Sequence, residues 1–185
     1  LLSMLAFAAN SLLCRLALKS GSIDPASFAA IRLASGAAML VLVMRVRRVS
    51  PVAHGSWAAA FWLFAYAATF SLAYVRLPAG VGALLLFGAV QATMVGAGLW
   101  RGERLSHRQW LGLALAMGGL VALLLPGLRA PPPGSAALML AAGVGWGAYS
   151  LHGKKAINAG AATAGNFVRA VPFAALLVAV CATQW

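Results

Sequence analysis

The chain has 185 residues, of which 63% are hydrophobic and only 9% are charged. A soluble domain is about half apolar and about one quarter charged, so this chain lacks the charged side chains that would cover a water-soluble globule. Lipid must therefore be the solvent for most of its outer surface, and a soluble enzyme is excluded.

The charge balance is strongly basic, with fourteen Lys and Arg residues against two acids, Asp24 and Glu103. In a soluble protein this balance would indicate nucleic-acid binding. Here the basic residues lie in short clusters between apolar runs, as in the cytoplasmic loops of membrane proteins, so we expect no nucleic-acid partner. Cys14 and Cys181 lie far apart inside apolar runs, which predicts neither a metal site nor a disulfide.

Seven apolar runs of about the length needed to cross a bilayer follow one another along the chain. Lipid leaves no water to satisfy unpaired backbone groups, so each run is predicted to be a transmembrane α-helix. The predicted spans are 1–19, 26–44, 57–75, 79–100, 109–125, 134–151 and 164–182.

A proline-rich connector separates the fifth run from the sixth. Residues 131–134 are three prolines and a glycine, which form the longest rigid connector between two runs. We therefore predict a first domain of five helices over residues 1–127, and a second domain that begins with two helices over residues 134–185.

Positive charges gather in alternate loops. Eight basic residues fall on one side of the predicted bundle and three on the other, so the positive-inside rule places the eight in the cytoplasm. The chain is then a multi-pass protein of the cell (inner) membrane with a cytoplasmic N-terminus. The eight are Arg45, Arg47, Arg48, Arg101, Arg104, Arg108, Lys154 and Lys155, and the three are Lys19, Arg76 and Arg129.

An internal repeat relates the first and second runs to the sixth and seventh. At a shift of 137 residues, 32–43 aligns with 169–180 with six identities in twelve, and Arg32 falls on Arg169. This pair is informative because an arginine inside a span is rare and costly. The repeat unit contains five helices, an odd number, so the second copy must enter the membrane inverted. Inverted repeats are typical of secondary transporters.

Three segments carry a resemblance to a known family: DPASFAAIRLASGAAML, LWRGERLSHRQWLGLALAMGGLVALLLPG and AAGVGWGAYSLHGKK. Through these motifs the chain resembles the drug/metabolite transporter superfamily, of the EamA type. Gln91 departs from the pattern, because many relatives have proline in this part of helix four, and Asn10 stands where relatives often have glycine. The resemblance implies ten helices in two inverted five-helix halves, of which this chain would carry seven. We therefore expect the chain to be a fragment of a longer gene product.

Polar and aromatic residues within the spans are the candidates for a substrate cavity. Arg32 either faces such a cavity or reaches the interface, where it could pair with Asp24, and Arg169 has the same alternatives. Each polar residue could also bond a neighbouring helix instead. Arg15 is expected to reach the interface, and Glu103 to balance the arginines of its loop. The six candidate residues are Asn10, Arg32, Gln91, Trp146, Asn166 and Arg169.

The leading functional hypothesis is a secondary transporter, an exporter of small organic metabolites that works by alternating access. The sequence has no phosphate-cradling loop, so an ion or solute gradient is the expected drive. A membrane-embedded lipid-modifying enzyme is the alternative, but the two acids and three histidines are scattered, and we expect no enzyme, cofactor or metal. A non-transporting membrane subunit is a further alternative. The expected partners are a small-molecule substrate and the lipid bilayer, and a homodimer is left open.

Overall fold

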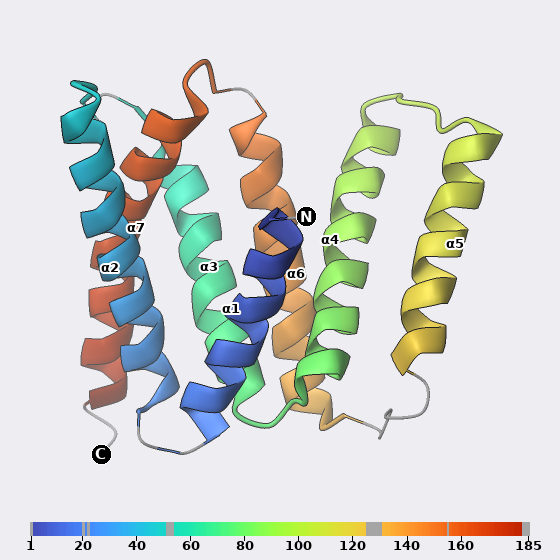
Figure 1. Ribbon diagram of the computed structural model, residues 1–185, viewed down its shortest axis with the longest axis horizontal. Helices are drawn as coiled ribbons and strands as arrows, with labels where there is room; N and C mark the ends of the chain where they lie inside the picture. The colour runs from blue at the N-terminus through green and yellow to red at the C-terminus, as the bar shows by residue number, and fades with distance from the viewer. Residues whose placement is uncertain are drawn as a thin grey trace.

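The computed structural model describes residues 2–19, 21, 23–50, 54–124, 131–154 and 156–182. All the regular structure in these residues is helical, and each predicted span coincides with one helix (Figure 1). The helices are α1 (Leu2–Lys19), α2 (Pro25–Val46), α3 (Trp57–Tyr74), α4 (Ala79–Trp100), α5 (His107–Leu124), α6 (Pro133–Gly153) and α7 (Ala159–Ala182).

Polar caps set where two of these helices begin. The Asp24 carboxylate accepts a hydrogen bond of 2.8 Å from the backbone N–H of Ser27, and a proline follows it at the first helical position of α2. The Asn158 side chain accepts a bond of 3.0 Å from the N–H of Ala161. This cap explains why α7 begins at Ala159, five residues before the predicted start, which rested on apolar content.

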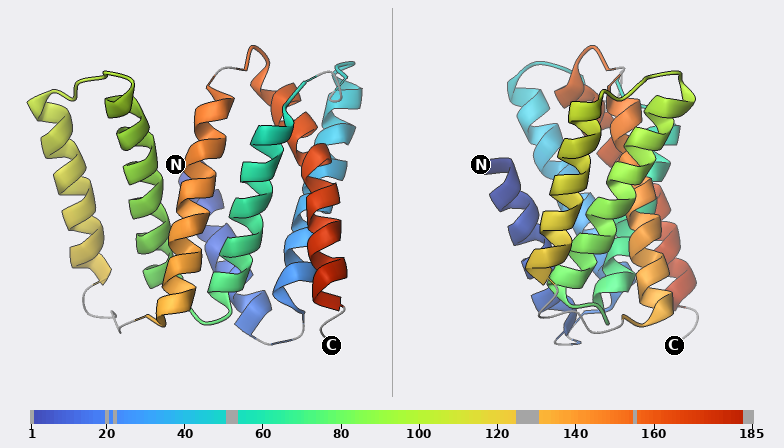
Figure 2. Two further views of the ribbon diagram at one scale, coloured as in Figure 1. Left: turned by 180° about the vertical axis from the view of Figure 1, so that it is seen from behind. Right: turned by 90° about the vertical axis from the view of Figure 1, so that its right-hand side faces the viewer.

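Consecutive helices run in opposite directions, but neighbours in sequence are not always neighbours in space. Two views agree that α6 lies between α3 and α4, while α7 packs against α2 and α3 (Figures 1 and 2). The helix α5 stands at one edge and packs on α4, and α1 lies against α3 and α4. The two helices after the proline-rich connector are therefore inserted among the first five.

Glycines of α6 make this insertion possible. A Cβ atom at Gly143 would lie 2.5 Å from the Cβ of Ala89 and 2.6 Å from the carbonyl oxygen of Leu86, so α6 and α4 touch backbone to backbone. A Cβ at Gly145 would lie 3.0 Å from the backbone nitrogen of Tyr66 on α3. Close approach of this kind supplies van der Waals contact where lipid provides no hydrophobic drive.

Four helices, α2, α3, α4 and α7, are long and apolar enough to cross a membrane by length and composition. Large apolar side chains such as Leu16, Leu42 and Leu115 stand on the outer surface, as lipid-facing residues do. These are features of a helical membrane protein. Seven spans stay a prediction, because this measure identifies these four helices within the described residues.

The basic loops gather at one end of the bundle. The α2–α3, α4–α5 and α6–α7 connections all lie at the upper end in Figure 1, as the antiparallel order of the helices requires. Seven of the eight grouped basic residues belong to the described chain, whereas Lys155 and, from the opposite group, Arg129 lie outside it. The side of the membrane that this end faces stays a prediction.

Candidate functional site

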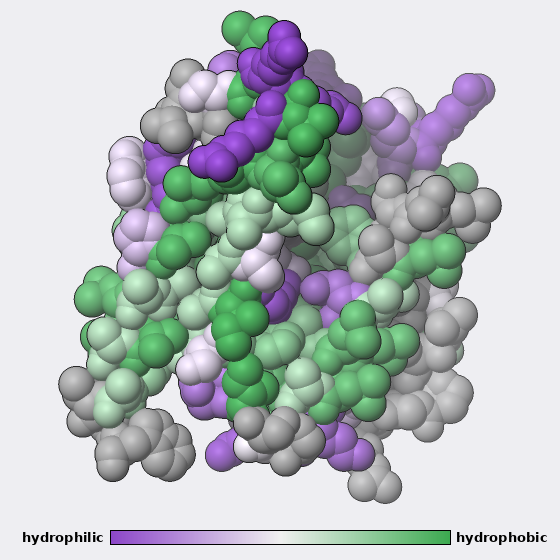
Figure 3. Space-filling model, turned by 60° about the vertical axis from the view of Figure 1, so that its left-hand side comes forward, coloured by the Kyte–Doolittle hydropathy of each residue, from purple (hydrophilic) through white to green (hydrophobic). Residues whose placement is uncertain are grey.

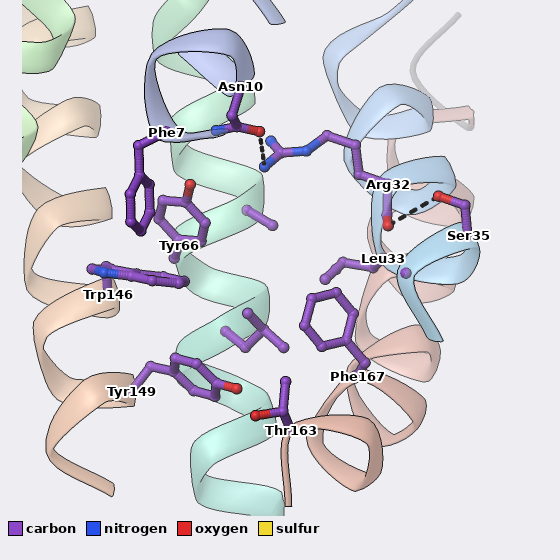
Figure 4. Close-up of a pocket in the computed structure, with 13 residues that line it drawn as sticks. Phe7, Asn10, Arg32, Leu33, Ser35, Tyr66, Trp146, Tyr149, Thr163 and Phe167 are labelled. Atoms are coloured by element: carbon purple, nitrogen blue, oxygen red, sulfur yellow. Dashed lines mark hydrogen bonds between the residues drawn. The ribbon is translucent and has the colours of Figure 1, made fainter. Parts of the chain in front are cut away.

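A cavity of about 640 Å³ is lined by residues of α1, α2, α3, α6 and α7 and opens at the surface of the bundle. On the face shown in Figure 3, hydrophilic residues lie in a recess between hydrophobic columns. Figure 4 shows the lining side chains, which are mostly apolar or aromatic. The volume falls within the range of about 300–1,000 Å³ that small-molecule sites occupy.

Aromatic rings form one wall of this cavity. The ring of Trp146 on α6 lies in the middle, with centroid distances of 4.9 Å to Tyr66, 5.5 Å to Tyr149 and 5.9 Å to Phe7. Phe167 of α7 stands on the other side of the cavity in Figure 4. Flat apolar faces therefore border the space on two sides.

Arg32 supplies the positive charge of the cavity. Its Nη2 atom donates a hydrogen bond of 3.3 Å to Oδ1 of Asn10 on α1, and the hydroxyl group of Tyr66 points toward this pair (Figure 4). Its guanidinium carbon lies 5.2 Å from the ring centroid of Phe70 and 5.8 Å from that of Phe28. Both distances permit cation–π attraction, which stabilises a guanidinium group within a bundle.

One nitrogen of this guanidinium group has no partner. Within the described part of the chain, Nη1 of Arg32 is the buried side-chain nitrogen or oxygen atom that makes no hydrogen bond. A buried donor without an acceptor costs roughly 1–3 kcal/mol, and more when the donor is charged. An acceptor placed here would recover that free energy.

Neither acid of the chain neutralises this charge. Asp24 lies about two helical turns before Arg32 and uses its Oδ1 to cap α2. Glu103 lines a separate cavity of about 220 Å³ with Gln91 and Lys154, on α4 and in the loops at the basic end. The sequence has no third Asp or Glu, so the cavity that contains Arg32 has no carboxylate of this chain in its wall.

The structure brings three of the six predicted residues together. Asn10, Arg32 and Trp146 line the large cavity. Gln91 is exposed on α4 and lines the smaller one. The remaining two, Asn166 and Arg169, belong to another group of contacts.

Asn166 and Arg169 hold the loop between α2 and α3. The side-chain oxygen of Asn166 accepts a bond of 2.9 Å from the N–H of Ser56, and Nη1 of Arg169 donates one of 2.7 Å to the carbonyl oxygen of His54. Gly55, between those two loop residues, has a φ of +86° and passes directly over α7. We call this group, His54 to Ser56 with Asn166 and Arg169, the α7 clamp.

Arg15 acts at the opposite end of the bundle. Its Nη1 atom donates to the carbonyl oxygens of Tyr74 and Val75, at distances of 2.7 and 2.9 Å, where α3 ends. Because α3 ends here, these carbonyl oxygens receive no hydrogen bond from a backbone N–H of the helix, and a cationic side chain that donates to them is favourable. Arg15 therefore caps the end of α3. That it reaches the membrane interface stays a prediction.

Sequence reasoning missed Phe7 and Phe167, which line the cavity from α1 and α7. A phenylalanine in an apolar span carries no signal that separates a cavity wall from a lipid-facing surface. Gly36 of α2 was missed as well, and a Cβ there would lie 2.6 Å from the Phe167 ring, so α2 and α7 pack tightly beside the cavity.

Comparison with known proteins finds one relative with substantial similarity. The chain is 58% identical over 178 residues to an uncharacterized protein of Pseudomonas aeruginosa. This match covers 96% of the chain but 62% of the relative, so the chain spans less than two thirds of that protein's length. No protein-family model matches the chain, and no solved structure matches it.

Proposed function

We propose that the chain belongs to a secondary transporter that moves small organic molecules across the cell (inner) membrane by alternating access, with export as the direction. The observation that carries the proposal is the cavity between the first five helices and the two that follow. It holds a charged group with an unsatisfied donor, Arg32, inside a helical bundle. Ionisable groups within membrane spans face the bundle interior or a water-filled cavity, and they mark substrate and ion pathways.

The packing of α2 on α7 supports the inverted repeat that this mechanism needs. The repeat places Arg32 and Arg169 at equivalent positions, and the two helices that carry them lie side by side in opposite directions. A two-fold axis in the membrane plane, passing between α2 and α7, would relate the two copies. We propose the complete fold as ten helices in two inverted five-helix repeats, of which the described residues supply seven.

The two equivalent arginines have different partners, which is the second support. Arg169 reaches a backbone carbonyl in the α7 clamp, at the end of the bundle where the basic loops lie. Arg32 contacts Asn10 and leaves Nη1 without a partner. In an inverted-repeat transporter the two copies exchange conformations, so the two arginines would alternate between a loop-bound and a cavity-facing state.

The test is transport by the purified natural protein in liposomes. A panel of organic acids, amines and neutral metabolites is offered under proton and sodium gradients of either direction. Arg32→Ala should reduce transport more strongly than it reduces the amount of folded protein in the membrane. Arg76→Ala, which removes an exposed arginine from the α3–α4 loop, is the matched control and should leave both unchanged.

Two results would contradict the proposal. One is that no solute of the panel moves under any gradient, although the protein is folded and oriented in the liposomes. The other is that Arg32→Ala lowers transport and folded protein in equal proportion, which would give Arg32 a structural role only.

A further inference from the structure

The wall of the large cavity selects for the charge of a ligand. Arg32 contributes a positive charge, and no carboxylate of this chain lines the cavity. An organic cation would enter a space in which the described residues supply a fixed like charge and no counter-charge, which is unfavourable at low dielectric constant. An anion would meet an arginine that has no counter-ion among the described residues.

The free donors of Arg32 fit a planar oxyanion. A guanidinium group has five N–H donors in one plane, and a carboxylate can accept two of them in parallel. Phe70 and Phe28 lie near the guanidinium group, while Nη2 and Nη1 form its donor edge. Figure 4 shows this edge directed from α2 toward Asn10 across one end of the cavity.

The rest of the cavity fits a flat apolar body. Trp146 and Tyr149 lie on one side and Phe167 on the other, at the end away from Arg32 (Figure 4). Rings prefer edge-to-face or offset contact with such neighbours, and an aromatic ligand would gain these contacts in addition to burial. One end of the cavity therefore favours an anion and the other an aromatic ring.

We propose, on the basis of the transport function proposed above, that the substrates are organic monoanions in which a carboxylate is joined to an aromatic ring by a short chain. The carboxylate oxygens accept hydrogen bonds from Nη1 and Nη2 of Arg32, and the ring lies between Trp146 and Phe167. Nη1 is buried in this conformation, and Nη2 is bonded to Asn10. Binding of the carboxylate therefore requires new side-chain rotamers of Arg32 and Asn10, which break the bond between them and expose both nitrogens to the ligand.

Binding to the purified natural protein tests this class independently of transport. Calorimetry in detergent compares three probes that share a phenyl ring and a three-carbon chain: 3-phenylpropionate, 3-phenylpropionamide and 3-phenylpropylamine. We expect the acid to bind at least tenfold more tightly than the amide, and the amine to bind most weakly. A fourth probe, 3-cyclohexylpropionate, should bind several-fold more weakly than the aromatic acid.

The variants separate charge from fold. Arg32→Gln should bring the affinity for the acid down to that for the amide while the affinity for the amide stays unchanged. Arg32→Lys keeps the charge but loses the paired donors, so it should retain part of the preference. Arg76→Gln is the matched control and should bind all probes as the unchanged protein does. If Arg32→Gln does not fold, the ranking of the three probes on the unchanged protein decides the question.

Each remaining outcome has a defined meaning. An amine that binds as tightly as the acid, no binding of the acid, or an acid preference that survives Arg32→Gln would overturn the proposed class. If other solutes are transported while the acid does not bind, the class fails and the transport function stands. If the acid binds as expected but nothing is transported, the site stands and the transport function fails.

Discussion

Replacing Gly55 by alanine should loosen the α7 clamp. At a φ of +86°, an L-residue is disfavoured by about 1–2 kcal/mol relative to glycine. The new Cβ would also lie 2.6 Å from Oδ1 and 2.9 Å from the backbone nitrogen of Asn166. A rotamer change cannot relieve the second contact, so the loop must move away from α7. The bond from Ser56 to Asn166 is then lost, which costs about 1–3 kcal/mol for a buried acceptor.

Gly102 provides a control with the same backbone strain and none of the contacts. Its φ is +85°, it lies in a loop at the same end of the bundle, and a Cβ there would have no atom within 4 Å. Gly102→Ala should therefore destabilise by about 1–2 kcal/mol. Gly55→Ala should destabilise by about 2–5 kcal/mol, because the strain and the lost bond add.

Thermal unfolding can be followed through Cys14, which is only 2% exposed. In a background in which Cys181 and any cysteine outside this sequence are replaced by alanine, a thiol-reactive dye labels Cys14 when the bundle opens. Equal shifts of the midpoint for Gly55→Ala and Gly102→Ala would refute the reasoning, since the contacts with α7 would then contribute nothing to stability.

Two further predictions concern packing and topology. Gly143→Ala should push α6 away from α4 and destabilise the protein by about 1–3 kcal/mol in the same assay. Gly118→Ala on α5, where a Cβ would have no atom within 4 Å, is the control and should be neutral or slightly stabilising. Equal effects of the two substitutions would argue against the close α4–α6 contact. Fusions of a fluorescent reporter after Arg48 and after Arg104 should report a cytoplasmic location, and a fusion after Arg76 an external one; a single reversed result would contradict the proposed orientation.

The helices could be predicted because each depends on its own residues. An apolar run of about twenty residues has one stable backbone conformation in lipid, and loops with proline, glycine or charge interrupt it. The partners of each helix could not be predicted. Small residues on α6 indicate that some helix approaches closely, but nothing in a glycine such as Gly143 identifies α4 as that helix.

In the candidate site, too, the residues could be predicted from the sequence but their partners could not. Arg32 and Arg169 carry the same signal, a charge in an apolar run, and that signal indicates that a partner exists. The partner is a side chain on α1 for one and a loop carbonyl for the other. Which of these applies depends on where the neighbouring helices lie, and the spacing along one chain does not contain that information.

The position of α6 between α3 and α4 has a consequence for how the protein is made. Helices enter the bilayer in the order of synthesis, yet α3 and α4 are held together chiefly through α6, and α6 itself packs mainly on these two helices rather than on α7. The hairpin of α3 and α4 is therefore not a finished unit when it leaves the ribosome. We therefore expect the facing surfaces of α3 and α4 to come together only once residues 133–153 are inserted, because most of their contacts are made with α6.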